Sequence, residues 1–517
     1  MNHRLRLREV SRGASLASVG MALFTLAIYA RTMAPTITWR NAGSDSGDFV
    51  TAAINLGVPH PTGYPLYTML AHLVTIWPGA EPARCVTFLS AIAGALAVGI
   101  FFWTAYHWVT TQEGVHPALG LAAAWAGSGL VAFGELLWSQ ATIAEVYSLH
   151  ALLCALWLAI ALHAPERRRP YLLALVFGLG MANHVTFVLL LPALWPYLPT
   201  LRRWWSPKRL FALSLSLLPG LLAYLYIPIR AAAQPVPNWG QADDLRRLLW
   251  LVTGEIYRVY IRRPRLALLK QRFPTWAGTW TRNLGPVGLT LALLGLGRGI
   301  ETQRRFHFAG ITYVIVLSVY VLLYGTVDAY LYLIPALLVC ALWAARGAAV
   351  AVRTLQRWGQ SMRRGTLAAA AGLLALSALP LAPLGANFQR MDLHADDEAA
   401  AYARSVLQAA GENALVISGG DEQTFSLWYL RYGLQERPDV MLADQGLLAF
   451  AWYRENLAAR HPELSAVTQA RDAQHALLLL LEEVGRTHAI HLTYSDPYLS
   501  RLATWEHEPP LYTLVRD

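Results

Sequence analysis

Charged residues are scarce in this sequence. Asp, Glu, Lys and Arg make up only 14% of the 517 residues, and 55% are hydrophobic, whereas soluble domains carry about a quarter charged residues. This deficit excludes an ordinary soluble globular protein and is typical of a chain that crosses a membrane many times. The 19 tryptophans and 23 tyrosines fit aromatic belts at two membrane interfaces.

Cysteine and lysine are nearly missing as well. The three cysteines (Cys85, Cys154 and Cys340) all lie in apolar segments without metal-ligand or redox spacing, which argues against a disulfide framework. Lys208 and Lys270 are the only lysines, so the net charge of +10 comes almost entirely from arginine. Because the arginines cluster in short loops, they indicate membrane orientation, and we expect no nucleic-acid partner.

Apolar runs of membrane-spanning length recur as far as residue 387. The first follows a basic N-terminal segment, and we interpret it as a retained signal anchor. The run 171–198 is too long for one span and is interrupted by Asn183 and His184, which predicts two short helices meeting at a polar turn. The other runs lie near 14–34, 85–110, 117–137, 141–162, 208–229, 284–299, 306–325, 329–347 and 366–387, so that about eleven spans are predicted.

The arginines predict the orientation of these spans. With the N-terminus in the cytoplasm, every inner loop is basic and the short outer turns carry no lysine or arginine, as the positive-inside rule requires. The inner loops are 1–13, 163–170, 200–209 (with Arg202, Arg203, Lys208 and Arg209), 298–305 and 346–364, and the outer turns lie near 138–140, 183–184 and 326–328. We therefore predict an integral protein of a bacterial-type inner or plasma membrane.

The sequence divides into two parts. Residues 1–388 form the predicted transmembrane domain, with outer loops at 35–83 and 231–283. Residues 389–517 form the predicted soluble, extracytoplasmic α/β domain, because polar residues and short strand and helix patterns replace the apolar runs. We expect strands at 414–418, 439–443, 489–494 and 511–515, and helices at 425–434 and 474–484. The predicted fold class is thus mainly α, with a small C-terminal α/β domain.

Polar residues of the predicted spans gather at the outer membrane face. Asp45, Asp48 and His60 lie in the first outer loop, and Glu135, Glu145, Asn183, His184 and Asp328 lie at outer span ends or turns. Carboxylates at membrane depth are costly and usually mark a water-filled or substrate-lined cavity. Each one alone can equally be a paired structural residue, but their common placement favours an outward-facing site.

The first outer loop has two interpretations. A helix beginning at Asp45 puts both aspartates on one face, with Asp45 as N-cap and Asp48 at the third helical position, which is a capping-box-like start. Alternatively, the pair supplies catalytic carboxylates at the membrane surface. Gly57 is a plausible end for this helix, and Pro59 forbids its continuation.

Several segments together carry a resemblance. The motifs are Asp45–Phe49, Leu56–Tyr67, Ser139–Gln140, Ala144–His150, Asn183–His184, Pro237–Gly240 and Gly420–Tyr429. In this order the chain resembles a multispan family, formerly of unknown function, that includes an ER protein O-mannosyltransferase. The resemblance implies a glycosyltransferase of the GT-C superfamily, which uses a polyprenyl-linked sugar on the outer or lumenal side. Family members usually have Glu at the position of Asp48 and Pro at that of Thr62.

The implied function is transfer of a sugar, with mannose as one candidate, from a polyprenyl-phosphate donor to a protein or glycan hydroxyl. Inverting transfer needs a base for the hydroxyl proton, for which we expect Asp45, with Asp48 as its orienting partner. The phosphate needs positive charge, which Arg258, Arg262 and Arg263 supply, unless they are interfacial arginines that contact lipid. The expected donor- and substrate-binding residues are His60, Tyr64, Glu145, His150, Asn183, His184, Trp239, Arg258, Arg262 and Arg263.

No metal ligand is predicted, although a diphosphate donor would call for a divalent metal. Two other classes of function remain open at this point. A transporter or flippase would suit the intramembrane acids, but the inverted repeats and paired broken helices of many transporters are not evident. In a non-catalytic assembly factor, the C-terminal domain would bind a partner while the spans only anchor it.

Overall fold

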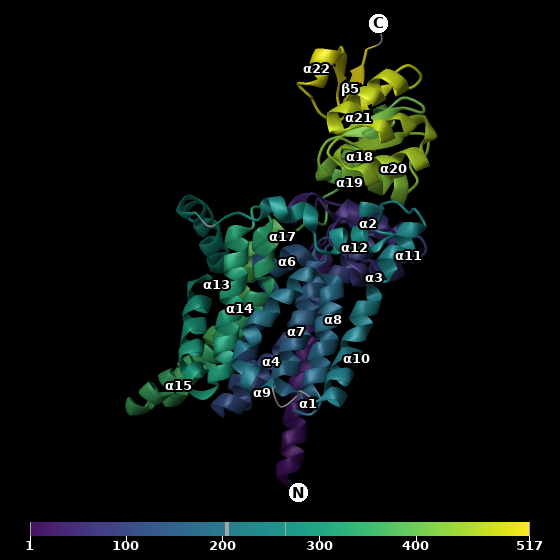
Figure 1. Ribbon diagram of the computed structural model, residues 1–517. Helices are drawn as coiled ribbons and strands as arrows, with labels where there is room; N and C mark the ends of the chain where they lie inside the picture. The colour runs from purple at the N-terminus through teal and green to yellow at the C-terminus, as the bar shows by residue number, and fades with distance from the viewer. Residues whose placement is uncertain (1, 202–205, 264, 516–517) are drawn as a thin grey trace.

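The computed structural model describes residues 2–201, 206–263 and 265–515. A helical bundle forms one end of the molecule and a small α/β domain the other (Figure 1). Arg202 and Arg203, which the sequence places in an inner loop, lie outside the described residues. The described chain is mainly helical, as predicted.

The bundle is built from long apolar helices connected by short helices at the end that faces the α/β domain. Its long helices are α1 (Asn2–Thr32), α4 (Pro82–Glu113), α5 (Pro117–Phe133), α7 (Tyr147–His163), α8 (Arg169–Asn183), α10 (Pro207–Ala223), α13 (Leu266–Thr302), α14 (Arg304–Leu323), α15 (Ile334–Ser361) and α16 (Gly365–Ala378). The shorter helical pieces are α2 (Ser46–Asn55), α3 (Pro65–Thr75), α6 (Glu135–Ala141), α9 (Leu198–Leu201), α11 (Tyr226–Ala232), α12 (Leu245–Val252) and α17 (Leu381–Met391). The 3-10 segments are η1 (Arg40–Ala42), η2 (Val185–Tyr197), η4 (Trp239–Gln241), η5 (Glu255–Tyr260) and η6 (Ala329–Leu333).

Each predicted apolar run contains a helix, and the predicted break is present. Helix α8 ends at Asn183 and η2 begins at Val185. Among the described residues, 6 helices are long and apolar enough to cross a membrane, or 7 if α5 and α6, bent by 60°, form one span. Helices such as α7 and η2 are shorter apolar segments. The count of eleven spans therefore stays a prediction.

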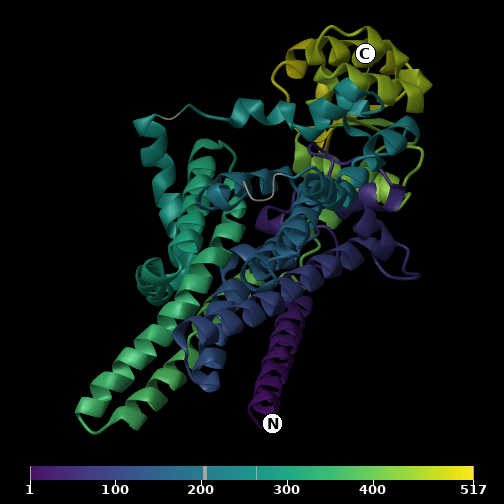
Figure 2. The ribbon, with the colours of Figure 1, turned by 60° about the horizontal axis from the view of Figure 1, so that its bottom comes forward.

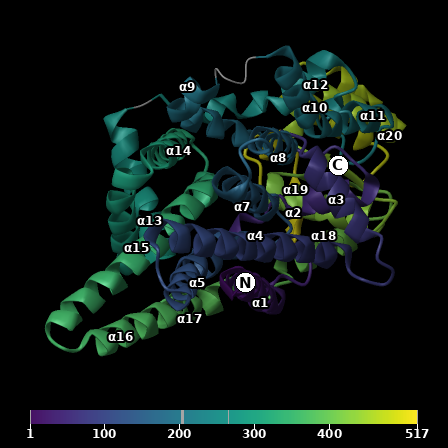
Figure 3. The same ribbon diagram turned by 90° about the horizontal axis from the view of Figure 1, so that it is seen from below.

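Glycines let the bundle helices approach closely. A Cβ on Gly220 of α10 would lie 2.0 Å from the carbonyl carbon of Gly178 on α8. A Cβ on Gly347 of α15 would lie 1.8 Å from the carbonyl oxygen of Leu291 on α13. Small residues at such crossings are the usual basis of helix packing in membranes. Seen from below, α4 runs beside α1 and α7, and the α15–α16 hairpin extends to one side (Figures 2 and 3).

The C-terminal domain contains a five-stranded sheet of order β2-β1-β3-β5-β4. Strands β1 (Leu415–Ser418), β2 (Met441–Asp444) and β3 (Ile490–Leu492) are parallel, and β5 (Leu511–Leu514) and β4 (Trp505–Glu508) complete the sheet in antiparallel fashion. Its helical elements are α18 (Glu398–Ala409), α19 (Asp421–Trp428), η7 (Tyr429–Gly433), η8 (Leu447–Ala449), α20 (Ala451–Arg460), η9 (Pro462–Gln469), α21 (Ala473–Leu479), η10 (Leu480–Val484) and α22 (Leu499–Leu502).

The sequence predicted four of these strands, but it missed β4, α18 and α20. The helix expected at 425–434 begins earlier, at Asp421 directly after β1. This difference places the N-terminus of α19 at the carboxyl edge of the parallel strands. The predicted domain boundary at 388/389 falls inside α17, three residues before its end at Met391.

Candidate active site

Asp48 is fully buried on α2 and holds two other residues in place. Its Oδ2 accepts hydrogen bonds from the backbone nitrogen of His60 at 2.9 Å and from His60 Nδ1 at 2.7 Å. Its Oδ1 accepts one from Trp239 Nε1 at 3.2 Å. The capping interpretation of the pair is therefore wrong for these side chains, because Asp45 stands at the N-cap position without a side-chain cap bond and Asp48 faces His60 instead.

The imidazole of His60 is fixed on several sides. Since Nδ1 donates to Asp48, Nε2 is directed toward Asp45, whose Oδ2 lies 3.6 Å away. The ring of Phe49 lies 4.8 Å and that of Tyr64 5.1 Å from it, centroid to centroid. A hydrogen bond from one ring nitrogen to a carboxylate usually fixes the orientation of the imidazole and the protonation state of its other nitrogen.

Asp45 differs from Asp48 in being accessible. Its side chain keeps 34% of its surface exposed, whereas that of Asp48 keeps none. No hydrogen bond to the Asp45 carboxylate is found among the described residues. Of the two aspartates, Asp45 is thus the one that is open to solvent.

A short backbone pairing brings Trp239 to the first loop. Val58 and Asn238 form a parallel bridge, with Val58 N donating to Pro237 O at 2.8 Å and Trp239 N donating to Val58 O at 3.1 Å. A Cβ on Gly57 would lie 2.7 Å from Pro237 O, so this contact needs glycine. The motifs around 57 and 238, which are distant in sequence, thus form one unit.

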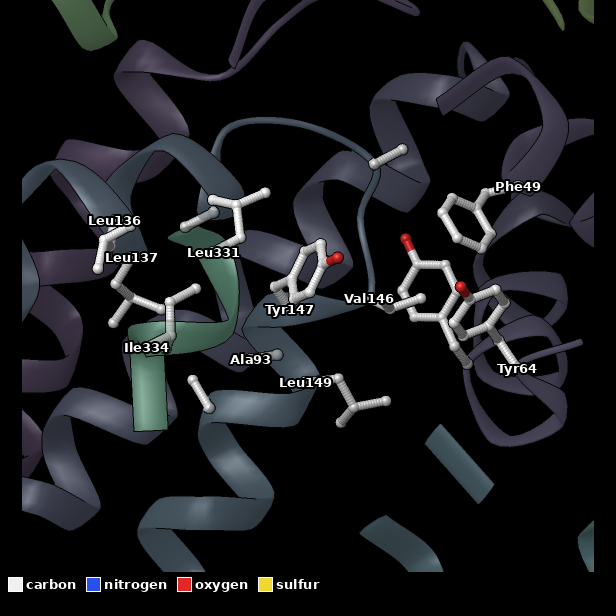
Figure 4. Packing of buried hydrophobic residues seen from close by; sticks show 14 of the residues in the cluster. Phe49, Tyr64, Ala93, Leu136, Leu137, Val146, Tyr147, Leu149, Leu331 and Ile334 are labelled. Atoms are coloured by element: carbon white, nitrogen blue, oxygen red, sulfur yellow. The ribbon is translucent and has the colours of Figure 1, made fainter. Parts of the chain in front are cut away.

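An aromatic and histidine layer lies beneath the carboxylates. The ring of His184 lies 5.6 Å from Tyr64, 5.5 Å from Tyr147 and 5.6 Å from His150. Figure 4 shows Tyr64 beside Phe49, with Tyr147 between this pair and Leu331. The predicted residues Tyr64, His150 and His184 are therefore brought together.

The polar members of this layer are buried and incompletely paired. Asn183 donates to Val146 O at 3.3 Å, but neither its Oδ1 nor Nδ1 of His150 has a hydrogen-bond partner among the described residues. Glu145 is 3% exposed, and its carboxylate accepts from Val146 N at 3.2 Å. His184 uses Nδ1 to cap η2 through Thr186. Buried polar atoms without a protein partner call for an explanation, such as a catalytic role or a bound water or ion.

Glu135 does not join this cluster. Arg282 of α13 and Arg390 of α17 both pair with its carboxylate, the latter at 2.7 Å. The sequence analysis placed Glu135 among the residues of the outward-facing site, and the structure corrects this placement. The Glu135 carboxylate forms ion pairs with Arg282 and Arg390 and so connects α6 to α13 and α17.

The three predicted arginines do not gather at the carboxylates. Arg258 is 66% exposed, lies 4.0 Å from Glu255, and lines a surface pocket with Trp250 of α12. Arg263 is exposed. Both departures have the same cause, since η5 and the segment after it run along the surface of the α/β-domain end of the bundle.

Arg262 has a different position. An antiparallel bridge between Ile261 and Tyr324 places it beside Gly325, whose Cβ would lie 2.8 Å from Arg262 Nε. Arg272, which the sequence did not single out, donates to Thr326 O at 3.0 Å. Burial lowers the pKa of Arg272, with the charge of Arg262 acting in the same direction and that of Asp328 opposing it. The turn that contains Asp328 is thus contacted by two arginines, Arg262 through the backbone bridge and Arg272 through its hydrogen bond.

The C-terminal domain also reaches the site. The Phe425 ring of α19 lies nearly parallel to that of His60, with an interplanar angle of 13° and centroids 6.3 Å apart. Asp421 opens the same helix, and its carboxylate acts on both His60 and Asp45 electrostatically. The motif Gly420–Tyr429 contains the start of this helix, but its position against the first loop could not be inferred from the sequence.

The surroundings of the pair raise the pKa values of both Asp45 and His60. Burial raises the pKa of Asp45 to about 7, with Asp421, Asp328 and Asp48 adding to the rise and His60 opposing it. Burial would lower the pKa of His60, but Asp45 and Asp48 outweigh it and raise this pKa to about 9. A carboxylate that titrates near 7 beside an imidazolium is suited to general acid–base chemistry. Among the described residues, no group of three or more His, Cys, Asp and Glu side chains is arranged to hold a metal ion.

The fold has clear counterparts among solved structures. ArnT from Cupriavidus metallidurans bound to undecaprenyl phosphate matches with a TM-score of 0.57 and 14% identity, over 97% of this chain and 98% of that one. The oligosaccharyltransferase from Archaeoglobus fulgidus matches with a TM-score of 0.50 and 14% identity, over 94% of this chain and 68% of that one. The protein therefore has the fold of the GT-C membrane glycosyltransferases.

Sequence comparison narrows this class. Residues 45–206 match the family model of the protein O-mannosyl-transferase TMEM260 N-terminal domain, and residues 399–475 match the TMEM260-associated domain 2. The mouse protein O-mannosyl-transferase TMEM260 is 26% identical over 505 residues, covering 87% of this chain, and the Dictyostelium discoideum protein is 24% identical over 483 residues, covering 83%. The chain spans 65% and 57% of the length of these two relatives. The predicted resemblance is confirmed: the chain is similar in sequence to the TMEM260 O-mannosyl-transferases and has a GT-C fold.

Proposed function

We propose that this protein is an integral-membrane glycosyltransferase that moves a sugar, with mannose as the leading candidate, from a polyprenyl-phosphate donor to a protein hydroxyl. The observation that carries the proposal is the pair formed by the accessible carboxylate of Asp45 and the fixed imidazole of His60, 3.6 Å apart. Relatives named protein O-mannosyl-transferase support the sugar and the acceptor. A solved structure of the same fold bound to undecaprenyl phosphate supports the donor.

In this reaction Asp45 accepts the proton of the acceptor hydroxyl. The hydroxyl oxygen forms a bond to C1 of the sugar, and the bond between C1 and the phosphate oxygen breaks, with its electron pair leaving on the phosphate. Attack from the face opposite to the leaving group inverts the configuration at C1. His60 stays protonated beside Asp45 and favours the ionised carboxylate, while Asp48 holds the His60 ring in position.

The leaving phosphate needs a positive site of its own. Arg262 and Arg272 are the arginines that the structure favours for it, because both lie near the 324–328 turn that precedes η6. Guanidinium groups bind phosphate oxygens in a bidentate manner. Arg258 is assigned instead to the lipid headgroup region, since it is exposed and lines a surface pocket with residues of amphipathic helix α12, and Arg263 is exposed as well. No step of this proposal passes through a metal ion.

The proposal includes an orientation. The site and the C-terminal domain lie on the outer side of a bacterial-type membrane, with the N-terminus in the cytoplasm, because basic residues concentrate in the loops at the other end of the bundle. An impermeant thiol reagent tests this after Cys85, which is partly exposed, is replaced by serine. Glu412→Cys in the C-terminal domain should react in intact cells, and Glu166→Cys should react only after permeabilisation. Reaction of both from the same side contradicts the orientation.

Turnover is the direct test of the function. Purified protein in liposomes is given radiolabelled mannosyl-phosphoryl-polyprenol and a Ser/Thr-rich acceptor peptide, and transfer is measured for the wild type and for Asp45→Asn. Loss of the general base should reduce transfer about 10²–10⁴-fold. Asn keeps the size of the side chain, so that insertion and thermal stability should change little.

Asp397→Asn is the matched control. Asp397 occupies an N-cap position in α18, is exposed, and makes no side-chain cap bond. It should transfer sugar at the wild-type rate. Equal, near-normal transfer by both variants would remove Asp45 from the chemistry. Movement of intact mannosyl lipid across the bilayer without sugar transfer would support a flippase instead.

A further inference from the structure

Helix α19 of the C-terminal domain rests directly on α2 of the first loop. A Cβ on Gly47 would lie 2.2 Å from the carbonyl oxygen of Phe425, so the two helix backbones touch at a position that only glycine permits. Gly47 lies between Asp45 and Asp48 in the chain. The contact is therefore made at the centre of the candidate active site, not at its margin.

Further bonds fix the domain in this position. Trp39 Nε1 donates to the Glu422 carbonyl and to Ser426 Oγ, both at 2.9 Å. Asn55 Nδ2 donates to Tyr432 O at 3.2 Å. These bonds join residues on both sides of Asp45 and Asp48 in the first loop to α19 and η7.

Asp421 and Phe425 lie one turn apart on this face. Residues four apart in a helix share a side, and Phe425 is the one whose ring lies against His60. Asp421 is exposed at the start of α19, and its carboxylate makes no hydrogen bond with any of the described residues. The C-terminal domain thus acts on the imidazole of His60 through the Phe425 ring and through the charge of Asp421.

We propose that the C-terminal domain is an integral part of the active site, with Phe425 and Asp421 as positioning residues that hold the ring of His60 and set the charge around Asp45. The proposal deepens the proposed function and rests on it for the role of Asp45. This proposal goes beyond the proposed function because it assigns part of the active site to the C-terminal domain, which otherwise would only bind a partner.

The electrostatic environment supports this assignment. The negative charge of Asp421 raises the pKa of both Asp45 and His60. The other ionisable groups around the pair are Asp48 on α2, Asp328 before η6, Glu145 before α7, Tyr64 before α3, Tyr257 in η5 and His184 before η2. Asp421 is the charged group in this set that the C-terminal domain contributes.

The sign of the effect follows from the charge. Removing the carboxylate in Asp421→Asn destabilises the protonated form of His60 and stabilises the ionised form of Asp45, so both pKa values fall. The expected fall is roughly 0.5–1 pH unit, the size of one charge acting through a partly solvated site. Asp421→Glu keeps the charge and should restore the wild-type values.

Deuterium exchange at the Cε1 carbon of His60, followed by mass spectrometry against pH, measures the His60 pKa in the full-length protein without any turnover. Asp421→Asn should lower the midpoint, whereas Asp421→Glu and the neighbouring control Glu422→Gln should leave it in place. Phe425→Leu should accelerate the exchange, because it removes the ring that lies over the imidazole.

Kinetics supply the second readout. Asp421→Asn should move the acid limb of kcat/KM to lower pH, whereas a merely structural defect would lower the rate equally at every pH. An unchanged His60 midpoint in Asp421→Asn, or an equal shift in Glu422→Gln, overturns the inference. A shifted midpoint in a protein that transfers no sugar supports the contact between domains and contradicts the proposed function.

Discussion

Replacing Asp48 by asparagine tests whether this carboxylate is a scaffold. In the native protein Oδ2 accepts two hydrogen bonds from His60 and Oδ1 accepts one from Trp239 Nε1. Asparagine has one acceptor oxygen and one donor amide. If the oxygen stays with His60, the amide faces the Trp239 N–H, and two donors meet in a fully buried position.

The cost can be estimated from these bonds. A buried donor without an acceptor costs about 1–3 kcal/mol, and replacing a charge-assisted bond to His60 by a neutral one costs about 1 kcal/mol more. The sum of about 2–4 kcal/mol corresponds to about 30- to 900-fold in turnover if the whole effect is felt in the transition state. We expect part of it to appear as lower thermal stability instead.

A double-mutant cycle with Trp239→Phe identifies the source of this loss. Phenylalanine removes the N–H, so the Asp48→Asn change should be milder in that background, with a coupling of about 1–2 kcal/mol. Packing lost with the indole is the same in both backgrounds and cancels. The cycle of Trp239→Phe with Asp45→Asn is the control and should show little coupling. Strict additivity for Asp48, or near-normal turnover of Asp48→Asn, would refute the scaffold role.

Two further predictions concern the charges of the site. Turnover should rise as Asp45 loses its proton through about pH 7 and fall as His60 loses its proton through about pH 9, giving a bell-shaped kcat/KM profile; a profile without these limits contradicts the assignment. Joint replacement of Arg262 and Arg272 by glutamine should raise the donor concentration for half-maximal rate about 10- to 100-fold. Arg258→Gln serves as control, and an equal effect there would indicate binding to lipid headgroups generally.

The fold was largely predictable because its signals are local. Apolar runs mark helices wherever they lie, and polar Asn183 and His184 interrupt one run at the place where α8 ends. The parallel strands of the C-terminal domain are also recognisable in the sequence, as short apolar runs between turns. The missed helices α18 and α20 are only 12 and 10 residues long and lack the long apolar run that marks the bundle helices.

The composition of the site was only partly predictable because several of its contacts are made by pairing between distant segments. Trp239 reaches Asp48 through the bridge between Val58 and Asn238. Arg272 in α13 is distinguished by the hydrogen bond of its side chain to Thr326 O, in the turn that follows α14. A count of arginines in the loop could not separate those near the 324–328 turn from those on the surface.

Which aspartate acts as the base was open in the sequence, since three residues separate Asp45 from Asp48 and a helix puts both on one face. Their surroundings now distinguish them. Asp48 is fully buried, and its two oxygens accept hydrogen bonds from His60 and Trp239, so a substrate hydroxyl cannot reach it. Asp45 keeps an exposed face and a pKa near neutral pH. A base must both meet its substrate and release the proton again, and these two requirements together favour Asp45, with Asp48 maintaining the imidazole that keeps Asp45 ionised.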